Sequence, residues 1–314
     1  MPFAADHLEE KQPSIQLLLL GVYVIVGLFV GAFVGFAAAI ACYGLNLISD
    51  LSWAAGQDLS RVGALKLVLV GQSIGMFLLP ALALSLTERK SASSFYGTRS
   101  PKANLMLWVL LFMLCSLPIS GLITELNAHM HLPRFLRSVE KWMSDKEKEA
   151  LTITKAILGA QAPMTMLINL LVMAVVPAVA EEFLFRGALQ RTLFRFRQNP
   201  HFAIWISAFV FSAIHLQFFG FFPRLLLGVA FGYIYFWTGN IWYSIFAHFL
   251  NNAYVVVLAF YLSKKNIPLD KADEMDVNWV VYIISAVLTV ALLKYLRDRS
   301  AFGVRRHQNS AHEN

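Results

Sequence analysis

Long apolar runs alternate with short polar segments along most of this chain. Eight of the runs have about the length, near 20 residues, that an α-helix needs to cross the hydrocarbon core of a bilayer. We therefore expect an all-α, polytopic membrane protein with about eight transmembrane helices. The expected helices cover approximately residues 15–43, 65–86, 104–123, 164–186, 202–219, 222–238, 241–262 and 278–296.

One long polar segment, residues 129–161, separates the third run from the fourth. Within it, apolar residues recur at helical spacing among charges of both signs, which predicts an amphipathic helix at the membrane interface. Such a helix could also gate access to a site. The apolar positions are Leu132, Phe135, Leu136, Val139, Trp142 and Met143.

The charge distribution predicts how the chain is oriented. The sequence holds 26 Lys and Arg against 19 Asp and Glu, and such an excess is expected in loops that face anionic cytoplasmic lipid, so no nucleic-acid partner is implied. Basic segments follow the second, fourth and eighth runs, all on one side of the membrane, which predicts that both termini are cytoplasmic. The mixed charges of residues 129–161 oppose this orientation only weakly. The basic residues are Arg89, Lys90, Arg99, Lys102, Arg191, Arg195, Arg197, Arg297, Arg299, Arg305 and Arg306.

Three polar motifs interrupt the apolar runs. One ionisable side chain at the centre of a bilayer costs about 2.5 to 3.5 kcal/mol, so a cluster of them indicates a function. The motifs are Glu181-Glu182-x-x-x-Arg186, Phe211-x-x-x-His215 and His248-x-x-x-Asn252.

The first motif supplies two carboxylates that face different neighbours. Glu182 and Arg186 are four residues apart, so on a helix they share a face and can form an ion pair that lowers the cost of burying either charge. Glu181 lies about 100 degrees away around the helix. The alternative interpretation is a juxtamembrane charge cluster that continues through Arg191 and Arg195.

The other two motifs supply donors and acceptors for hydrolysis. A carboxylate can take a proton from water, a histidine such as His215 can position that water, and the pair His248 and Asn252 can hold a developing oxyanion. Asn251 lies within about 60 degrees of that face and is a second candidate. The combination predicts hydrolysis of an amide bond without a Ser or Cys nucleophile.

Together, the three motifs on successive membrane helices resemble the CAAX-prenyl-protease and bacteriocin-processing family of intramembrane proteases, also called the Abi family. The resemblance covers about residues 164–261, and Glu181-Glu182-Phe-Leu-Phe-Arg186-Gly187 is typical of bacterial members. It implies that Glu181 activates the attacking water and His215 shares it, that Glu182 and Arg186 orient and neutralise the site, and that His248 and Asn252 stabilise the tetrahedral intermediate.

The resemblance also implies an organisation, a location and a substrate. Residues 1–163 would hold N-terminal helices and the interfacial region, residues 164–262 a catalytic four-helix core, and residues 263–314 a last helix with a basic cytoplasmic tail. The chain would lie in a bacterial inner membrane and act on a membrane-associated peptide or protein. Whether the substrate is prenylated stays open.

Two questions about the chemistry stay open at this stage. We expect no cofactor, because the chain lacks a His-Glu-x-x-His motif, but Glu181, His215 and His248 could form a three-ligand zinc site if their helices converge. The alternatives to a protease are a bacteriocin-immunity or scaffold protein without catalysis, and a proton-coupled transporter that uses the same ionisable residues as a relay.

Overall fold

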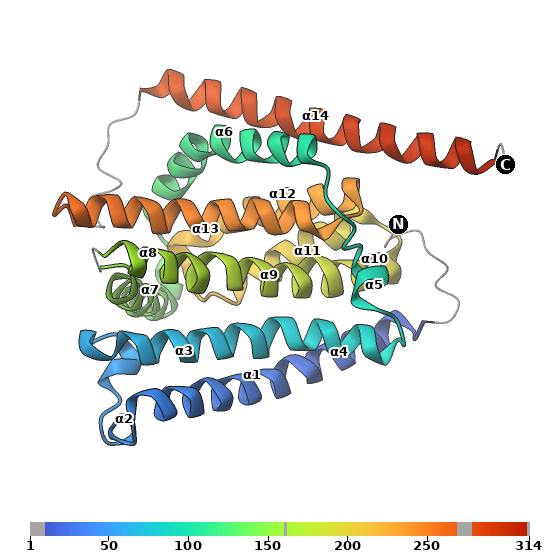
Figure 1. Ribbon diagram of the computed structural model, residues 1–314. Helices are drawn as coiled ribbons and strands as arrows, with labels where there is room; N and C mark the ends of the chain where they lie inside the picture. Colours follow the sequence, from blue (N-terminus) through green and yellow to red (C-terminus); the bar gives the residue numbers. More distant parts are fainter. Residues whose placement is uncertain (1–9, 160–161, 269–277, 313–314) are drawn as a thin grey trace.

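The protein, described here from a computed structural model, is an all-helical bundle (Figure 1). The structure describes residues 10–159, 162–268 and 278–300, and the backbone alone of residues 301–312. Within these described residues, seven helices are long and apolar enough to cross a membrane, and an eighth apolar helix, Pro200–Ala213, has 14 residues. The prediction of an all-α polytopic membrane protein is therefore confirmed.

The bundle has three parts (Figure 1). Helix α1 packs against α3 and α4 on one side, α6 packs against α14 on the other, and α8 to α13 lie between them. The larger α-helices are α1 (Pro13–Tyr43), α3 (Val62–Ser73), α4 (Leu79–Thr87), α6 (Ala103–Ala128), α7 (Arg137–Leu158), α8 (Pro163–Leu170), α9 (Val176–Glu182), α10 (Arg191–Arg197), α11 (Pro200–Ala213), α12 (Phe221–Thr238), α13 (Ile241–Lys264) and α14 (Trp279–His312). Short helices are α2 (Asn46–Ser49), α5 (Ala92–Tyr96), and the 3₁₀ turns η1 (Ser52–Ala55), η2 (Leu59–Arg61), η4 (Arg134–Leu136) and η7 (Phe218–Gly220).

Two predicted helix ends are wrong. The fourth run was expected to end at residue 186, but the helix continues from Pro163 to Arg197, because the charge of Arg186 is neutralised inside the bundle and does not face water. The fifth was expected to continue to residue 219, but α11 ends at Ala213. The interfacial helix was expected within residues 129–161, and α7 forms there.

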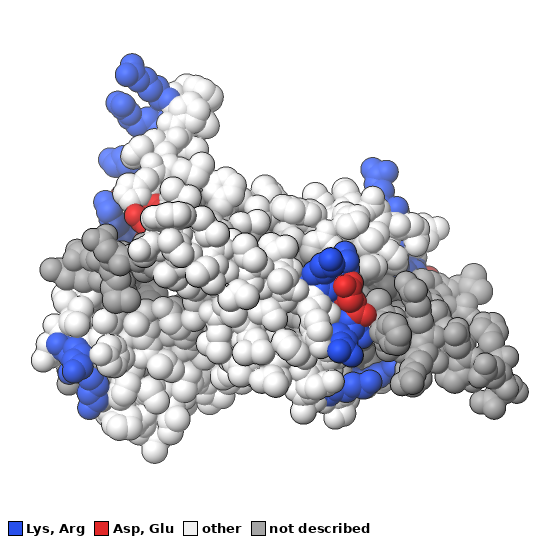
Figure 2. Space-filling view, turned by 90° about the horizontal axis from the view of Figure 1, so that it is seen from above, with Lys and Arg blue, Asp and Glu red and all other residues white. Residues whose placement is uncertain are grey.

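The polar segments gather at the two ends of the bundle. Both described chain ends and the segments that follow α4 and α10 lie at one end, as the charge pattern predicts (Figure 1). On the face shown in Figure 2, Lys, Arg, Asp and Glu side chains likewise lie toward the two ends, and the middle is formed by other residues. The predicted basic tail falls on α14, which continues to His312, and side chains from residue 301 onward lie outside the described part.

Glycines let α1 approach its neighbour closely. A Cβ atom added at Gly31 would stand 2.3 Å from the backbone oxygen of Gly71 on α3, so only glycine allows this distance. Small residues at four-residue spacing serve this purpose in membrane helices, where tight packing drives association.

Two of the long helices contain a π-helical turn just before a proline. The turns are η3 (Ile74–Leu78), which precedes Pro80, and η5 (Leu171–Val175), which precedes Pro177. Proline has no N–H to donate, and its ring crowds the carbonyl of the preceding turn, so the helix widens there. The second turn comes directly before the segment that carries the two predicted carboxylates.

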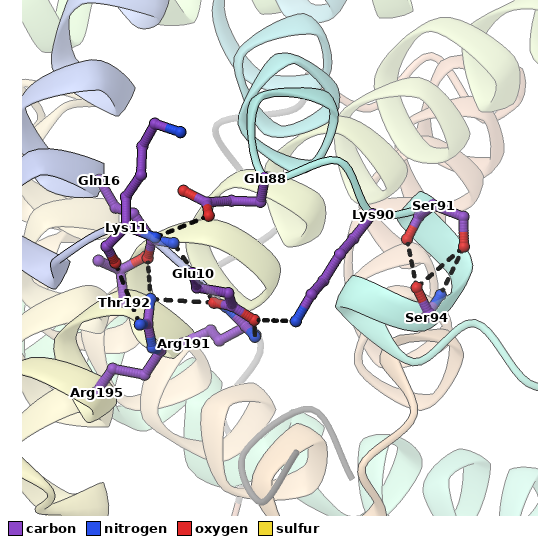
Figure 3. A network of polar contacts seen from close by, with 10 residues as sticks. All are labelled: Glu10, Lys11, Gln16, Glu88, Lys90, Ser91, Ser94, Arg191, Thr192 and Arg195. Carbon is purple, nitrogen blue, oxygen red and sulfur yellow. Dashed lines mark hydrogen bonds and ion pairs between the residues drawn. The ribbon is translucent and has the colours of Figure 1, made fainter. Parts of the chain in front are cut away.

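A buried ion cluster joins the start of the chain to α10 (Figure 3). The Glu10 carboxylate accepts hydrogen bonds from Nη1 and Nη2 of Arg191, at 2.9 and 2.6 Å. It also lies 2.8 Å from Lys90 Nζ and 3.0 Å from Arg195 Nη1. Its side chain is fully buried. Gln16 Oε1 accepts a further hydrogen bond from Arg195 Nη1 at 2.7 Å.

The charges around Glu10 determine its ionisation. Burial alone would raise the pKa of Glu10, but hydrogen bonds from Arg191 and Lys90 and the charge of Arg195 outweigh it and hold the pKa well below its usual range. Arg191 and Arg195 were expected in a cytoplasmic loop. In the structure they lie on α10, and they hold the residue that precedes α1.

We expect Glu10→Gln to lower the free energy of unfolding by about 3 to 5 kcal/mol at pH 7, because the cations around it would lose their carboxylate. Since the folded-state pKa lies below the ordinary value of 4.5, the stabilisation is complete above that pH and is lost as the pH falls further. Unfolding in mixed detergent micelles, followed from pH 7 to pH 3, measures both effects.

The control is Glu149→Gln, because Glu149 pairs with Lys146 on the surface, with its side chain 62% exposed. Such a pair contributes about 1 kcal/mol or less. Equal losses in the two variants would contradict a structural role for Glu10.

Candidate active site

The two carboxylates of the first motif lie at the end of α9, where the helix passes into the π-helical segment η6 (Phe183–Gln190). Glu182 and Arg186 are almost completely buried, and Glu181 is 8% exposed. π-helical turns inside α-helices are frequent at functional sites. The two neighbouring carboxylates have different surroundings, as their angular separation predicts.

Glu182 joins its own helix to α13. Its Oε1 atom lies 2.8 Å from Arg186 Nη1, so the ion pair expected from the spacing is present. The same oxygen accepts a hydrogen bond from His248 Nδ1 at 2.9 Å. Glu182 Oε2 has no hydrogen-bond partner among the described residues.

Aromatic rings surround the buried cation of this pair. The Arg186 guanidinium lies 4.7 Å from the ring centre of Phe211 and 5.6 Å from that of Phe231, and its Nη2 donates to the Gly228 carbonyl at 3.1 Å. The His248 ring stacks on Phe231 at 5.6 Å. A desolvated cation over ring faces is stabilised by about 2 kcal/mol, which offsets part of its burial cost. Phe211 therefore stabilises the buried Arg186 guanidinium through its ring.

His215 does not lie on a helix with Phe211, contrary to the expectation. Helix α11 ends at Ala213, and the next residues form a turn in which Leu216 has a φ of 55°, a region that branched residues rarely adopt. The pair nevertheless stays in contact, because His215 Nδ1 lies 2.8 Å from the Phe211 carbonyl oxygen. A carbonyl oxygen only accepts, so Nδ1 carries the proton, and the neutral ring has its acceptor at Nε2.

A cavity of about 100 Å³ brings residues of all three motifs together. This volume has room for several water molecules. Glu181 faces the cavity, and its Oε2 lies 3.8 Å from His248 Nε2. The lining residues are Glu181, Phe211, His215, Arg224, Leu227, Phe231, His248, Asn251 and Asn252.

Both asparagines of α13 line this cavity. Asn251 Nδ2 donates to Asn252 Oδ1 at 3.2 Å. Because this bond uses the amide oxygen of Asn252, it leaves that residue's Nδ2 group as the donor. The geometry thus orients the residue that the third motif predicts as an oxyanion donor.

The three side chains that could bind zinc, Glu181, His215 and His248, line the same cavity. Within the described ranges, no group of three His, Cys, Asp or Glu side chains is arranged to hold a metal ion.

Two residues, one in the cavity lining and one that holds the turn before α12, were not singled out from the sequence. Arg224 lines it from α12, at the start of an expected membrane span, and a charge inside such a run was the available signal. Asn127 of α6 donates to the Phe218 carbonyl at 3.0 Å and accepts from the Phe222 N–H at 2.9 Å. It holds the turn that leads into α12, and its sequence position at a helix end gave no sign of this contact.

Comparisons with known proteins agree with the motif pattern. Residues 163–254 match the family model described as type II CAAX prenyl endopeptidase Rce1-like, which confirms the expected resemblance for this segment. No solved structure matches the chain.

Two proteins of Bacillus subtilis (strain 168) are similar to part of the chain. YpbD, described as uncharacterized, is 29% identical over 142 residues, which cover 44% of this chain and 66% of YpbD. YdiL, described as a candidate membrane peptidase, is 30% identical over 105 residues, which cover 33% of this chain and 42% of YdiL. The chain thus aligns with less than two thirds of the length of either relative.

The two adjacent carboxylates should differ in their effect on stability. We expect Glu182→Gln to lower the free energy of unfolding by about 3 to 5 kcal/mol, because it leaves Arg186 buried without its ion pair. Glu181→Gln should change it by about 1 kcal/mol or less, or stabilise, because it removes a buried charge whose nearest charged partner is 3.8 Å away. Unfolding of the purified variants in mixed micelles measures the difference, and a greater loss for Glu181→Gln would reverse the assignment.

Proposed function

Because residues 163–254 carry an Rce1-like segment with all three motifs intact, we propose that this integral membrane protein is an endopeptidase whose site lies within the bundle. The observation that supports it most is the shared cavity, which holds a carboxylate, two histidines and two asparagine amides. These groups suit hydrolysis of an amide by activated water. The similarity to YdiL, described as a candidate membrane peptidase, points the same way.

In the proposed reaction, Glu181 is the general base. It faces the cavity, and its nearest ion-pair partner, His248 Nε2, is 3.8 Å away, so its carboxylate can accept a proton from water as the water oxygen attacks the peptide carbonyl carbon. His215 helps to hold that water, since its Nε2 lone pair can accept the second water hydrogen. The protonated Glu181 then gives its proton to the leaving amine as the C–N bond breaks.

The negative charge on the carbonyl oxygen would be held from α13. Asn252 donates through Nδ2, whose orientation follows from the bond that Asn251 makes to its Oδ1. His248 already donates from Nδ1 to Glu182, so a second donation, from Nε2 to the oxyanion, uses the protonated ring. Removing one such donor typically costs about a hundredfold or more in rate.

Glu182 and Arg186 act as positioning residues in this proposal. Their ion pair is completely enclosed, so neither side chain reaches the cavity. Glu182 fixes the orientation of the His248 ring, and Arg186 joins this unit to α12 through the Gly228 carbonyl. Holding the reacting groups in place in this way is a large part of enzymatic rate enhancement.

The proposed substrate is a membrane-associated peptide or protein. The site belongs to helices that are long and apolar enough to cross the membrane, so a substrate that partitions into lipid has the shortest path to it. Location in the inner membrane of a bacterium, with cytoplasmic termini, is part of the proposal.

Glu181→Gln should lower the rate of peptide cleavage by at least about a hundredfold, the scale of a lost general base. Full-length protein in detergent would be incubated with degenerate pools of apolar fluorogenic peptides, and mass spectrometry would locate the cuts. The matched control, Glu149→Gln, removes a surface carboxylate and should cleave at the wild-type rate.

Full activity in folded Glu181→Gln protein would exclude this carboxylate as the base. If folded wild-type protein cleaves no peptide pool, the result would favour the alternative of a scaffold or immunity protein without catalysis. Proton-coupled uptake into vesicles would then test the transporter alternative.

Prolonged treatment with EDTA or 1,10-phenanthroline should leave cleavage within about twofold of the untreated rate, because Glu181 can activate water without a metal ion. The rate is measured with the same peptide pools before and after dialysis. Loss of activity that only added Zn²⁺ restores would favour the zinc alternative with Glu181, His215 and His248 as ligands.

A further inference from the structure

Arg224 is the one arginine or lysine among the described residues that line the cavity, and none of the three motifs includes it. It lies in the first turn of α12, and its Nη2 donates to Gln217 Oε1 at 2.7 Å. Its Nη1 atom is buried and has no hydrogen-bond partner among the described residues. A buried donor without a partner has lost its hydration and gained no hydrogen bond in return, so its presence calls for an explanation.

The buried arginines Arg186 and Arg191 differ from Arg224 because each has a carboxylate partner. Arg186 forms an ion pair with Glu182 at 2.8 Å, and Arg191 donates hydrogen bonds from two nitrogens to the Glu10 carboxylate. Arg224 forms no ion pair with a carboxylate in the described part of the chain, although Glu147 of α7 and Glu181 are near enough to interact electrostatically with its charge. Burial raises the pKa of Glu147 above its usual range, although the Arg224 guanidinium and a hydrogen bond from the Phe219 N–H oppose the shift.

The position of Arg224 is held in advance of binding. Gln217 fixes one edge of the guanidinium, and Asn127 holds the turn between them from both sides, through the Phe218 carbonyl and the Phe222 N–H. A planar guanidinium fixed in this way presents donors that match the two oxygens of a carboxylate. Prepared binding groups of this kind lose little side-chain entropy when the ligand arrives.

We propose that Arg224 binds a carboxylate group of the peptide substrate beside the scissile bond. This inference rests on the proposed function, and it adds a substrate class: peptides with a negative charge close to the cut. The carboxylate could be the C-terminal one or that of an Asp or Glu side chain. Because Arg224 and Glu181 line the same cavity of about 100 Å³, the charge and the cut lie within a few residues of each other.

Three peptide pools test the proposal on full-length protein in detergent. All have the same degenerate apolar sequence; the first ends in a free carboxylate, the second in an amide, and the third in an amide but with one Asp or Glu at each position in turn. The kcat/KM of each pool is measured for wild type and for Arg224→Gln. We expect the first or the third pool to exceed the second by about tenfold or more in wild type, the scale of one hydrogen bond to a charged group, and the ratio to fall to about one in Arg224→Gln.

Three further variants separate binding from a general effect of charge. Arg197→Gln removes an exposed arginine at the end of α10 that does not line the cavity, and it should keep the wild-type ratio. Glu147→Gln should also keep it, whereas an Arg224 that serves only to balance Glu147 would make the two variants behave alike. Arg224→Lys keeps the charge without the planar fork, so it should retain part of the preference.

A binding measurement keeps the test independent of catalysis. Glu181→Gln protein should retain peptides of the preferred pool about tenfold better than amidated neutral peptides, and the double variant with Arg224→Gln should lose this difference. Equal retention of all pools, or a preference that survives Arg224→Gln, would overturn the inference. If wild type cuts nothing while the Arg224-dependent retention persists, the proposed function fails and the carboxylate site stands.

Discussion

The arrangement of this protein depends on one carboxylate that is shared between two helices. Glu182 Oε1 forms an ion pair with Arg186, one helical turn further along, and accepts a hydrogen bond from His248 of α13. These partners lower the cost of burying the Glu182 charge, and they connect the two helices inside the bundle. Arg186 connects the same pair to α12, because it donates a hydrogen bond to the Gly228 carbonyl. Because Glu182 occupies this face, the side chain of Glu181, the preceding residue, points to a different neighbour, which is the cavity.

The same long helix carries two ion clusters with different physical roles. At its far end, Arg191 and Arg195 surround Glu10, and every strong interaction there stabilises the folded chain and keeps the Glu10 pKa low. Around the cavity the interactions are weaker: Glu181 lies 3.8 Å from its nearest ion-pair partner, and Arg224 leaves one nitrogen without a hydrogen-bond partner in the described part of the chain. Each unsatisfied buried polar group calls for an explanation, and a role in binding substrate is the explanation that we propose for Arg224.

The predicted end of the fourth membrane span was wrong because charged residues were assigned to water without knowledge of their ion-pair partners. Arg186 was taken as the end of a helix, yet it is 1% exposed and the helix continues past it to Arg197. Arg191 and Arg195 were taken as loop residues for the same reason, and their partner Glu10 lies far away in the sequence, before the first apolar run. Helix α11 ends at Ala213 because the chain turns through His215 and Leu216. A hydropathy pattern does not reveal this turn, because the flanking residues are apolar.

Hydropathy and spacing were sufficient to predict the helical class, the approximate positions of the helices, the amphipathic α7 and the ion pair between Glu182 and Arg186. These features depend on local period and on partners four residues apart, which any helix places on one face. The sequence could not place His215 in a turn, join His248 to Glu182, bring Glu10 to α10, or leave Arg224 beside Glu181 without a carboxylate of its own. Each of these depends on contacts between helices that are distant in the chain, and only the packing of the bundle determines which side chains meet and which stay unpaired.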